Sequence, residues 1–118
     1  MHFSLKKADR ILKRREFVEL SQNGRRIQNE HFIAYFSCGR ENRSRLGVTV
    51  TKKVGGAVQR NRIKRQVREF FRLNRNCLSG EWDINVIAKI GVVGISSEEA
   101  HQSLQNIFDR ISNYADHR

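Results

Sequence analysis

Residues 51–75 have the sequence TKKVGGAVQRNRIKRQVREFFRLNR, and this stretch decides how the rest of the chain is interpreted. Its two glycines break the preceding strand pattern, and a helical pattern follows them. On a helix of 3.6 residues per turn, one stripe is almost entirely apolar and the adjacent arc is cationic. The stripe consists of Ile63, Val67, Phe70, Phe71 and Asn74, and the arc of Lys64, Arg65, Arg68, Arg72 and Arg75. The stretch predicts a helix that packs on a core by one face and presents cations on the next.

The cations of this helix have almost no acidic neighbours. Between Arg60 and Arg75 there are seven Lys or Arg and one acid, Glu69, so the alternation of sign that is typical of a solvated helix is missing. Like charges four residues apart, such as Arg68 and Arg72, weaken an isolated helix slightly. An external polyanion would compensate them, and the planar guanidinium suits phosphate oxygens. A charged face without any partner is the less favoured alternative.

The charge of the whole chain points to the same kind of partner. Its 118 residues include 23 Lys and Arg against 12 Asp and Glu, a formal net charge of +11. Residues 1–77 hold 20 of the basic and 6 of the acidic side chains, which predicts a polyanion-binding face in this part of the chain. The length predicts one domain, residues 1–118. No apolar run approaches the roughly 18 residues of a membrane span, and residues 1–16 carry charges where a signal peptide is apolar. We expect a soluble, cytoplasmic protein without a membrane partner.

No group of residues nominates a catalytic or metal site. Hydrolysis by the protein itself would need paired acids, a Ser or Cys with His, or a metal cluster. The acids are scattered singly, and the four histidines lie too far from one another and from the two cysteines for a standard zinc spacing. The glycine turn lacks the Gly-Lys-Ser/Thr sequence of a nucleotide-binding loop, although such a turn before a helix can hold a phosphate. We expect no catalytic residue and no metal or cofactor bound by the protein.

The remaining patterns place strands and helices around the basic helix. Residues 13–23 have a helical pattern, with Gly24 at the position of a left-handed C-terminal cap. A period of two extends over residues 27–38, and residues 46–51 form a second strand, which we interpret as its hairpin partner. Residues 82–89 alternate as a further strand, and Ser96 with Glu99 forms the capping-box signature of a last helix. This order predicts an α/β sandwich with a mixed sheet, centred on the strand, helix and strand of residues 46–89.

The segment from residue 46 to residue 72 closely resembles the protein subunit of bacterial ribonuclease P. That family characteristically has Leu-Gly-x-x-Val-x-Lys-Lys-x-Gly, followed by Ala-Val-x-Arg-Asn-Arg-x-Lys-Arg. The matching residues here are Leu46, Gly47, Val50, Lys52, Lys53, Gly55, Ala57, Val58, Arg60, Asn61, Arg62, Lys64 and Arg65. Agreement at Leu12, residues 15–17, Gly24, Arg25, Phe32, Tyr35, Asp83, Ala88 and Lys89 extends the resemblance over nearly the whole chain.

This resemblance implies a fold and a function. The family fold is an α+β two-layer sandwich, similar to a domain of ribosomal proteins, with a four-stranded mixed sheet and three helices. It includes a left-handed strand-helix-strand crossover, which general handedness rules would not predict. The implied function is to assist a catalytic RNA that cleaves the 5′ leader from precursor tRNA, with the Mg2+ ions of the reaction bound by that RNA. This division of labour would explain why the chain lacks a catalytic constellation.

The resemblance also assigns roles to individual residues. It implies that the catalytic RNA is contacted by Arg60, Asn61, Arg62, Lys64, Arg65 and Arg68, with Lys52 and Lys53 nearby. It also implies that Phe17, Tyr35 and Lys89 belong to a central cleft that holds the single-stranded leader. Relatives often carry a second aromatic residue one helical turn after Phe17, where this chain has Ser21, and Gly56 replaces the usual Asn before Ala57. Because Ser21 has no ring, leader stacking is expected to be weaker or to be supplied by other residues.

Two other classes of protein share parts of the pattern. A structural RNA-binding protein of the ribosome would have the same charge and fold class, and only residues 60–65 favour ribonuclease P over it. A helix-turn-helix regulator of DNA would also present a basic helix. It would need a short partner helix before that helix, and the sequence has a strand there instead.

Overall fold

The computed structural model describes residues 5–39, 43–78 and 80–116, except for the side chains of residues 77, 115 and 116. Its helices are α1 (Arg14–Asn23), α2 (Ala57–Asn74) and α3 (Ser97–Asp116), and its strands are β1 (Arg25–Gln28), β2 (Phe32–Cys38), β3 (Arg45–Thr49) and β4 (Trp82–Ala88). Short 3-10 turns lie at Lys7–Asp9, Arg75–Cys77 and Ile90–Gly94. The basic stretch is the long helix α2, as its periodicity predicts.

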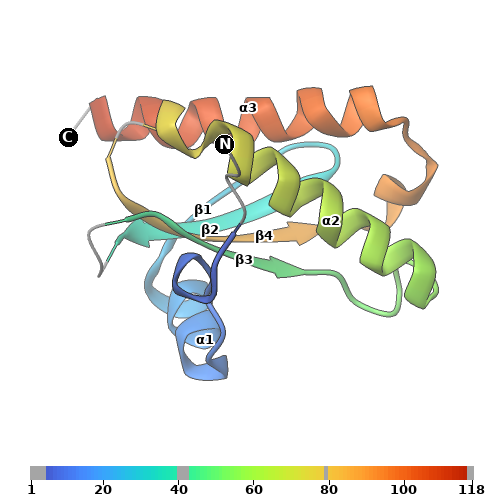
Figure 1. Cartoon of the computed structure of the whole chain (residues 1–118), viewed down its shortest axis with the longest axis horizontal. Helices are drawn as coiled ribbons and strands as arrows, with labels where there is room; N and C mark the ends of the chain where they lie inside the picture. Colours follow the sequence, from blue (N-terminus) through green and yellow to red (C-terminus); the bar gives the residue numbers. More distant parts are fainter. Residues whose placement is uncertain (1–4, 40–42, 79, 117–118) are drawn as a thin grey trace.

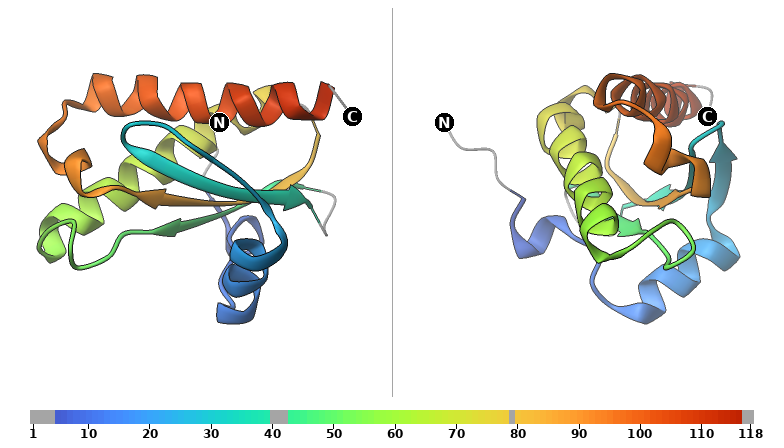
Figure 2. Two further views of the ribbon diagram at one scale, coloured as in Figure 1. Left: turned by 180° about the vertical axis from the view of Figure 1, so that it is seen from behind. Right: turned by 90° about the vertical axis from the view of Figure 1, so that its right-hand side faces the viewer.

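The four strands form one mixed sheet in the order β1-β2-β4-β3. β2 pairs antiparallel with β1 and with β4, whereas β3 pairs parallel with β4. Helices α2 and α3 cover one face of this sheet, and α1 lies at the other face (Figure 1). The connection from β3 through α2 to β4 turns in the left-handed sense (Figure 2). The α+β fold with four strands and three helices is therefore confirmed.

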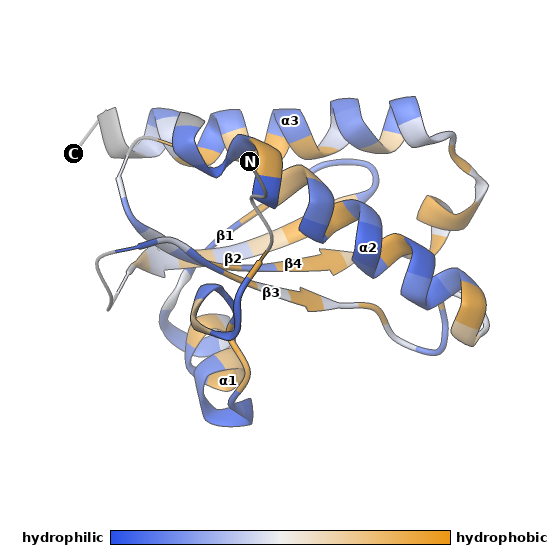
Figure 3. Cartoon of the chain, viewed as in Figure 1, coloured by the Kyte–Doolittle hydropathy of each residue, from blue (hydrophilic) through white to orange (hydrophobic). Residues whose placement is uncertain are grey.

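The core lies between the sheet and the pair α2 and α3. The predicted apolar stripe of α2 is buried, and α3 contributes a matching stripe, which contains Leu104, Ile107, Phe108 and Ile111. Phe70 and Phe108 meet edge to face, with their ring centroids 5.0 Å apart. Apolar residues of both helices face the sheet and hydrophilic residues face outward (Figure 3). Burying each large apolar side chain contributes about 1.5–3 kcal/mol, which fixes α2 with its cations toward solvent.

The structure differs from the predictions for the first strands. The alternation over residues 27–38 is not one strand, because Asn29 closes a turn between β1 and β2. Its Oδ1 accepts hydrogen bonds from the N–H groups of His31 and Phe32, both at 3.0 Å. The hairpin partner of β2 is β1, and the predicted hairpin between β2 and β3 is wrong, because β4 lies between them.

Gly24 ends α1 without the left-handed conformation that its position predicts. Its φ is −77° and its ψ is 170°, which is extended backbone. The N–H of Gly24 donates to the carbonyl oxygen of Leu20 at 2.9 Å, and a Cβ on Gly24 would lie 2.5 Å from that oxygen. The glycine is therefore required by the close approach of the two backbone segments.

Candidate nucleic-acid interface

The cations of α2 lie together on its outer face. Of the residues assigned there by resemblance, Asn61, Arg62 and Arg65 are exposed, and Arg60, Lys64 and Arg68 are half-buried. Lys52 and Lys53 are exposed in the turn that leads into the helix. Within the described ranges no ion pair involves any of these cations, whereas Arg72 pairs with Glu69 and Arg75 with Asp9. The predicted residues thus form one basic surface with few acids.

A groove of about 630 Å³ lies between α2 and the N-terminal segment. It is lined by Leu5, Arg10, Asn61, Arg65, Arg68, Glu69 and Arg72. Arg10 reaches the groove because the segment pairs with β3: residue 10 forms a bridge with Leu46, and the N–H of Ile11 donates to the Leu46 carbonyl at 2.9 Å. The sequence prediction missed Arg10, since no local pattern connects it with a helix that begins 47 positions later.

Uncompensated positive charge is concentrated in this groove. Burial, and then the neighbouring charge of Arg10, lower the pKa of Arg68. In the part of the chain that the structure describes, the Nε atoms of Arg10 and Arg60 are buried without a hydrogen-bond partner. A buried donor without a partner costs about 1–3 kcal/mol. An anion with several acceptor oxygens would satisfy the free donors and reduce the repulsion between the arginines.

A second candidate surface lies on the sheet face that carries α1. The register of the sheet brings one residue from each strand into a row, which we call the cleft row: Arg26, Tyr35, Asn85 and Gly47. The Phe17 ring of α1 lies on Gly47, because a Cβ on Gly47 would overlap that ring. The same Cβ would lie 3.4 Å from Oδ1 of Asn85, so Phe17, Asn85 and Tyr35 share one surface.

Lys89 lies at the end of this surface and is held by the β1–β2 turn. Its Nζ donates to the carbonyl oxygen of Asn29 at 2.6 Å, and its backbone N–H donates to the carbonyl of His31 at 2.9 Å. Ser21 is exposed, and its hydroxyl donates to the Val18 carbonyl at 2.8 Å. The structure thus brings Phe17 and Tyr35 onto one face, places Lys89 at its border, and leaves no ring at position 21.

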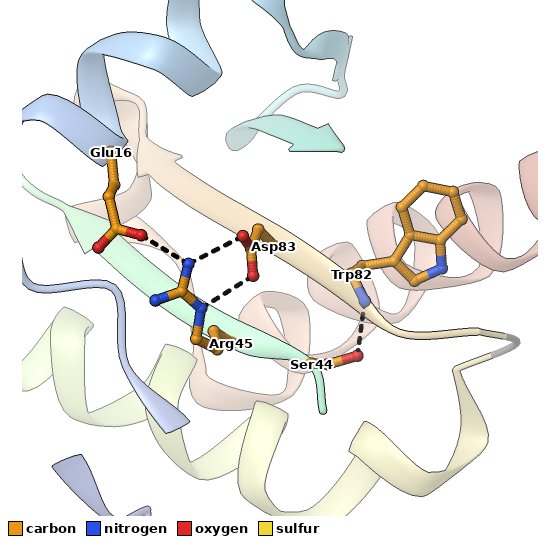
Figure 4. A network of polar contacts seen from close by, with 5 residues as sticks. All are labelled: Glu16, Ser44, Arg45, Trp82 and Asp83. Carbon is orange, nitrogen blue, oxygen red and sulfur yellow. Dashed lines mark hydrogen bonds and ion pairs between the residues drawn. The ribbon is translucent and has the colours of Figure 1, made fainter. Parts of the chain in front are cut away.

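A buried ionic network fixes α1 on the sheet (Figure 4). Nε and Nη2 of Arg45 donate to the two carboxylate oxygens of Asp83 at 3.0 and 2.9 Å, and Nη2 also donates to Glu16 of α1 at 2.7 Å. Asp83 hydrogen bonds raise the pKa of Arg45, burial opposes them, and Glu16 raises the pKa further. Both acids next to the cleft row are therefore neutralised by one arginine.

Metal-ligand clusters and membrane-spanning helices are both absent from the described ranges. No three His, Cys, Asp or Glu side chains in them are grouped so that they could hold a metal ion. Nor does any described helix combine the length and apolar character that crossing a membrane requires.

Comparison with known sequences identifies close relatives. Residues 5–112 match the family model Ribonuclease P. The ribonuclease P protein component of Desulfosudis oleivorans is 53% identical over 110 residues, which cover 93% of this chain and 91% of that protein. The ribonuclease P protein component of Desulfatibacillum aliphaticivorans is 50% identical over 115 residues, and 98% of each chain is covered.

Comparison with solved structures finds the same fold. The RNase P protein of Thermotoga maritima superimposes with a TM-score of 0.80 at 34% identity, covering 86% of this chain and 96% of that one. The RNase P protein of Staphylococcus aureus superimposes with a TM-score of 0.81 at 33% identity, covering 87% and 94%.

Proposed function

The chain belongs to the ribonuclease P protein family, and from this premise we propose how its two surfaces serve the enzyme. It is a protein subunit of ribonuclease P, the ribonucleoprotein endoribonuclease of tRNA processing, and its partner is the ribonuclease P RNA. The family match covers residues 5–112, so the alternative of a structural ribosomal protein is not favoured.

The basic surface of α2 binds the catalytic RNA. The observation that carries this assignment is the approach of Arg10 to Arg68 in a groove where the buried Nε of Arg10 has no hydrogen-bond partner. A phosphodiester offers the acceptor oxygens that these groups lack. Arg60, Asn61, Arg62, Lys64 and Arg65 extend the contact along the helix, and Lys52 and Lys53 extend it past its N-terminus.

The cleft row binds the single-stranded 5′ leader of precursor tRNA. Phe17 and Tyr35 present rings on one face, and unpaired bases can stack on such rings. Arg45 neutralises Glu16 and Asp83, so the acids nearest the row do not repel the phosphates of the leader. Lys89 adds positive charge at the border of this surface.

The hydrolytic chemistry resides in the RNA, with Mg2+ held by RNA oxygens. Four carboxylates of the protein, those of Asp9, Glu16, Glu69 and Asp83, are engaged in ion pairs with arginines. A carboxylate engaged in this way is a poor ligand for Mg2+, which prefers free oxygen ligands in a near-octahedral arrangement. The proposal places the protein in the cytoplasm, where the tRNA precursors on which the family acts are transcribed.

Reconstitution tests this function. Precursor tRNA is incubated with the cognate ribonuclease P RNA at low magnesium, with and without the protein, and the cleavage site is mapped. We expect cleavage at the mature 5′ end that depends on the protein, and no cleavage by the protein without the RNA. Absence of stimulation by the protein, together with tight binding to unrelated structured RNA, would contradict the proposal.

A further inference from the structure

Asn85 carries an unused polar group at the centre of the cleft row. Its side chain is almost completely buried, with 5% of the residue exposed. Oδ1 accepts a hydrogen bond from the Thr49 hydroxyl at 3.1 Å, which fixes the plane of the amide. Among the residues that the structure describes, its Nδ2 has no hydrogen-bond partner. Nδ2 is not one of the fully buried atoms without a partner, so it keeps contact with solvent, and this donor is available to a ligand.

Arg26 stands at one end of the same row with an unused cation. It lies directly opposite Tyr35 in the β1–β2 register, is exposed, and makes no hydrogen bond or ion pair with any described residue. The preceding residue, Arg25, lies on the opposite face, where its guanidinium stacks 4.6 Å from the ring centroid of Tyr114. One arginine of this pair thus supports the fold, and the other does not.

The geometry of the row suits an extended single strand. Neighbouring strands lie about 4.8 Å apart, so the row from Gly47 to Arg26 spans about 14 Å across the sheet. Along it follow the Phe17 ring on Gly47, the Asn85 amide, the Tyr35 ring and the Arg26 guanidinium. A strand that crosses the sheet would therefore meet two stacking surfaces, one donor for a base edge and one cation for a phosphate.

We propose that Asn85 donates a hydrogen bond to the edge of one leader base, and that Arg26 binds a leader phosphate. The inference rests on the proposed leader-binding function and deepens it, since it names a base-reading residue and a phosphate-binding residue. These two side chains supply polar contacts on a surface where Ser21 offers no second ring on α1. Asn85 selects a base whose acceptor lies where its Nδ2 points, whereas Arg26 acts on every sequence.

The two residues have distinguishable signatures. The test uses the holoenzyme, reconstituted from the protein and its cognate RNA, and precursor tRNAs with leaders of equal length. Each leader position is varied in turn through the four bases, and the dissociation constant of each precursor is measured. The wild-type enzyme is expected to prefer one base at one position. Asn85→Val is expected to reduce that preference by roughly five- to tenfold, the contribution of one hydrogen bond, and to leave other positions unchanged.

Arg26→Ala is expected to lower the affinity for every precursor equally, whatever its leader sequence, and to keep the base preference. It should also flatten the dependence of log affinity on log salt by about 0.7, the value for one phosphate of a single strand. Arg25→Ala is the matched control, because it removes the same charge from the neighbouring position on the opposite face. It should change neither the base preference nor the salt slope.

Affinity for the catalytic RNA alone reports whether each variant folds, since that contact uses the other face of the sheet. Valine suits a buried strand position, so Asn85→Val should retain this affinity. An unchanged base preference in Asn85→Val, no base preference in the wild type, or equal salt slopes for Arg26→Ala and Arg25→Ala would overturn the inference. If wild-type holoenzyme binds precursors with full and single-nucleotide leaders equally well, the leader-binding function itself fails.

Discussion

The Phe17 ring rests on the backbone of Gly47, so the position of α1 on the sheet depends on a glycine in β3. Gly47→Ala would place a methyl group where the ring lies. We expect a loss of about 1–3 kcal/mol in the free energy of unfolding, as in other overpacked sites, together with weaker leader binding. Chemical denaturation and precursor affinity measure the two effects. Gly94→Ala is the control, because a Cβ there meets no atom within 4 Å; equal effects of the two substitutions would refute the packing argument.

Arg45 is expected to be the most sensitive charged residue for stability. Arg45→Met would leave Asp83 and Glu16 without a cation in a site where the side chains are 5% and 15% exposed. Such a loss costs about 3–5 kcal/mol. Arg45→Lys should be intermediate, because an ammonium cannot reproduce the bidentate contact with Asp83. Arg43→Met is the control: the Arg43 side chain is 50% exposed, and its loss should cost less than about 1 kcal/mol. Denaturation midpoints that are similar for Arg43→Met and Arg45→Met would contradict this ranking.

Asp9 should make the stability of the protein depend on pH in the acidic range. Burial tends to raise the pKa of Asp9, but hydrogen bonds from the Lys6 N–H and from the Arg75 and Arg43 guanidiniums outweigh it and lower the pKa below its ordinary value. A lowered pKa stabilises the fold above the unfolded-state pKa of about 3.9, and this contribution disappears as the pH falls through the folded-state pKa.

The variant Asp9→Asn tests this acid dependence. It should be less stable than the wild type at pH 7, and the gap should shrink as the pH falls below about 4. Urea unfolding at pH 7 and at pH 3 makes the comparison. A gap of the same size at both pH values would show that the charge of Asp9 is not what matters.

Arg68 should have opposite effects on stability and on RNA affinity. Arg68→Met keeps the aliphatic stem and removes a charge that faces Arg10. We expect the isolated protein to be as stable as the wild type or more stable, because a repulsion is lost. Affinity for the catalytic RNA should fall, and its salt slope should flatten by about 0.7–0.9. Arg110→Met on α3 is the control with the same charge change, and an equal effect on its slope would exclude a specific contact at Arg68.

The sequence predicts the parts of the fold that depend on local periodicity. The buried stripe of α2 follows from spacing alone, and so does the start of α3, where the Glu99 N–H donates to Oγ of Ser96 at 3.1 Å. The sequence pattern does not reveal the β1–β2 hairpin, because a period of two continues on both sides of Asn29 and the turn contains neither Gly nor Pro. The parallel pairing of β3 with β4 agrees with the predicted strand-helix-strand unit of residues 46–89, whereas the left-handed sense of this crossover does not follow from general handedness rules.

The candidate site likewise combines residues that are adjacent in sequence with residues that only the fold brings together. The cations of α2 are adjacent in sequence and form one surface, as predicted. Arg10 joins them only through the pairing of residue 10 with Leu46, and Asn85 meets Tyr35 and Gly47 only through the sheet register. Resemblance places Phe17 and Tyr35 in a leader cleft, and that assignment stays a prediction, although the structure brings both residues to one face.

In the proposed function, the two faces of the sheet bind two different RNAs. The most direct test measures two affinities for each of two variants: that of the protein for the catalytic RNA, and that of the holoenzyme for a precursor with a full leader relative to a single-nucleotide leader. Arg68→Met should weaken the affinity for the catalytic RNA and leave the ratio between full and single-nucleotide leaders unchanged. Phe17→Leu keeps apolar bulk but removes the stacking ring. It should lower the leader affinity ratio and leave the affinity for the catalytic RNA unchanged. If each variant weakens both affinities to the same extent, the division between the two surfaces is wrong.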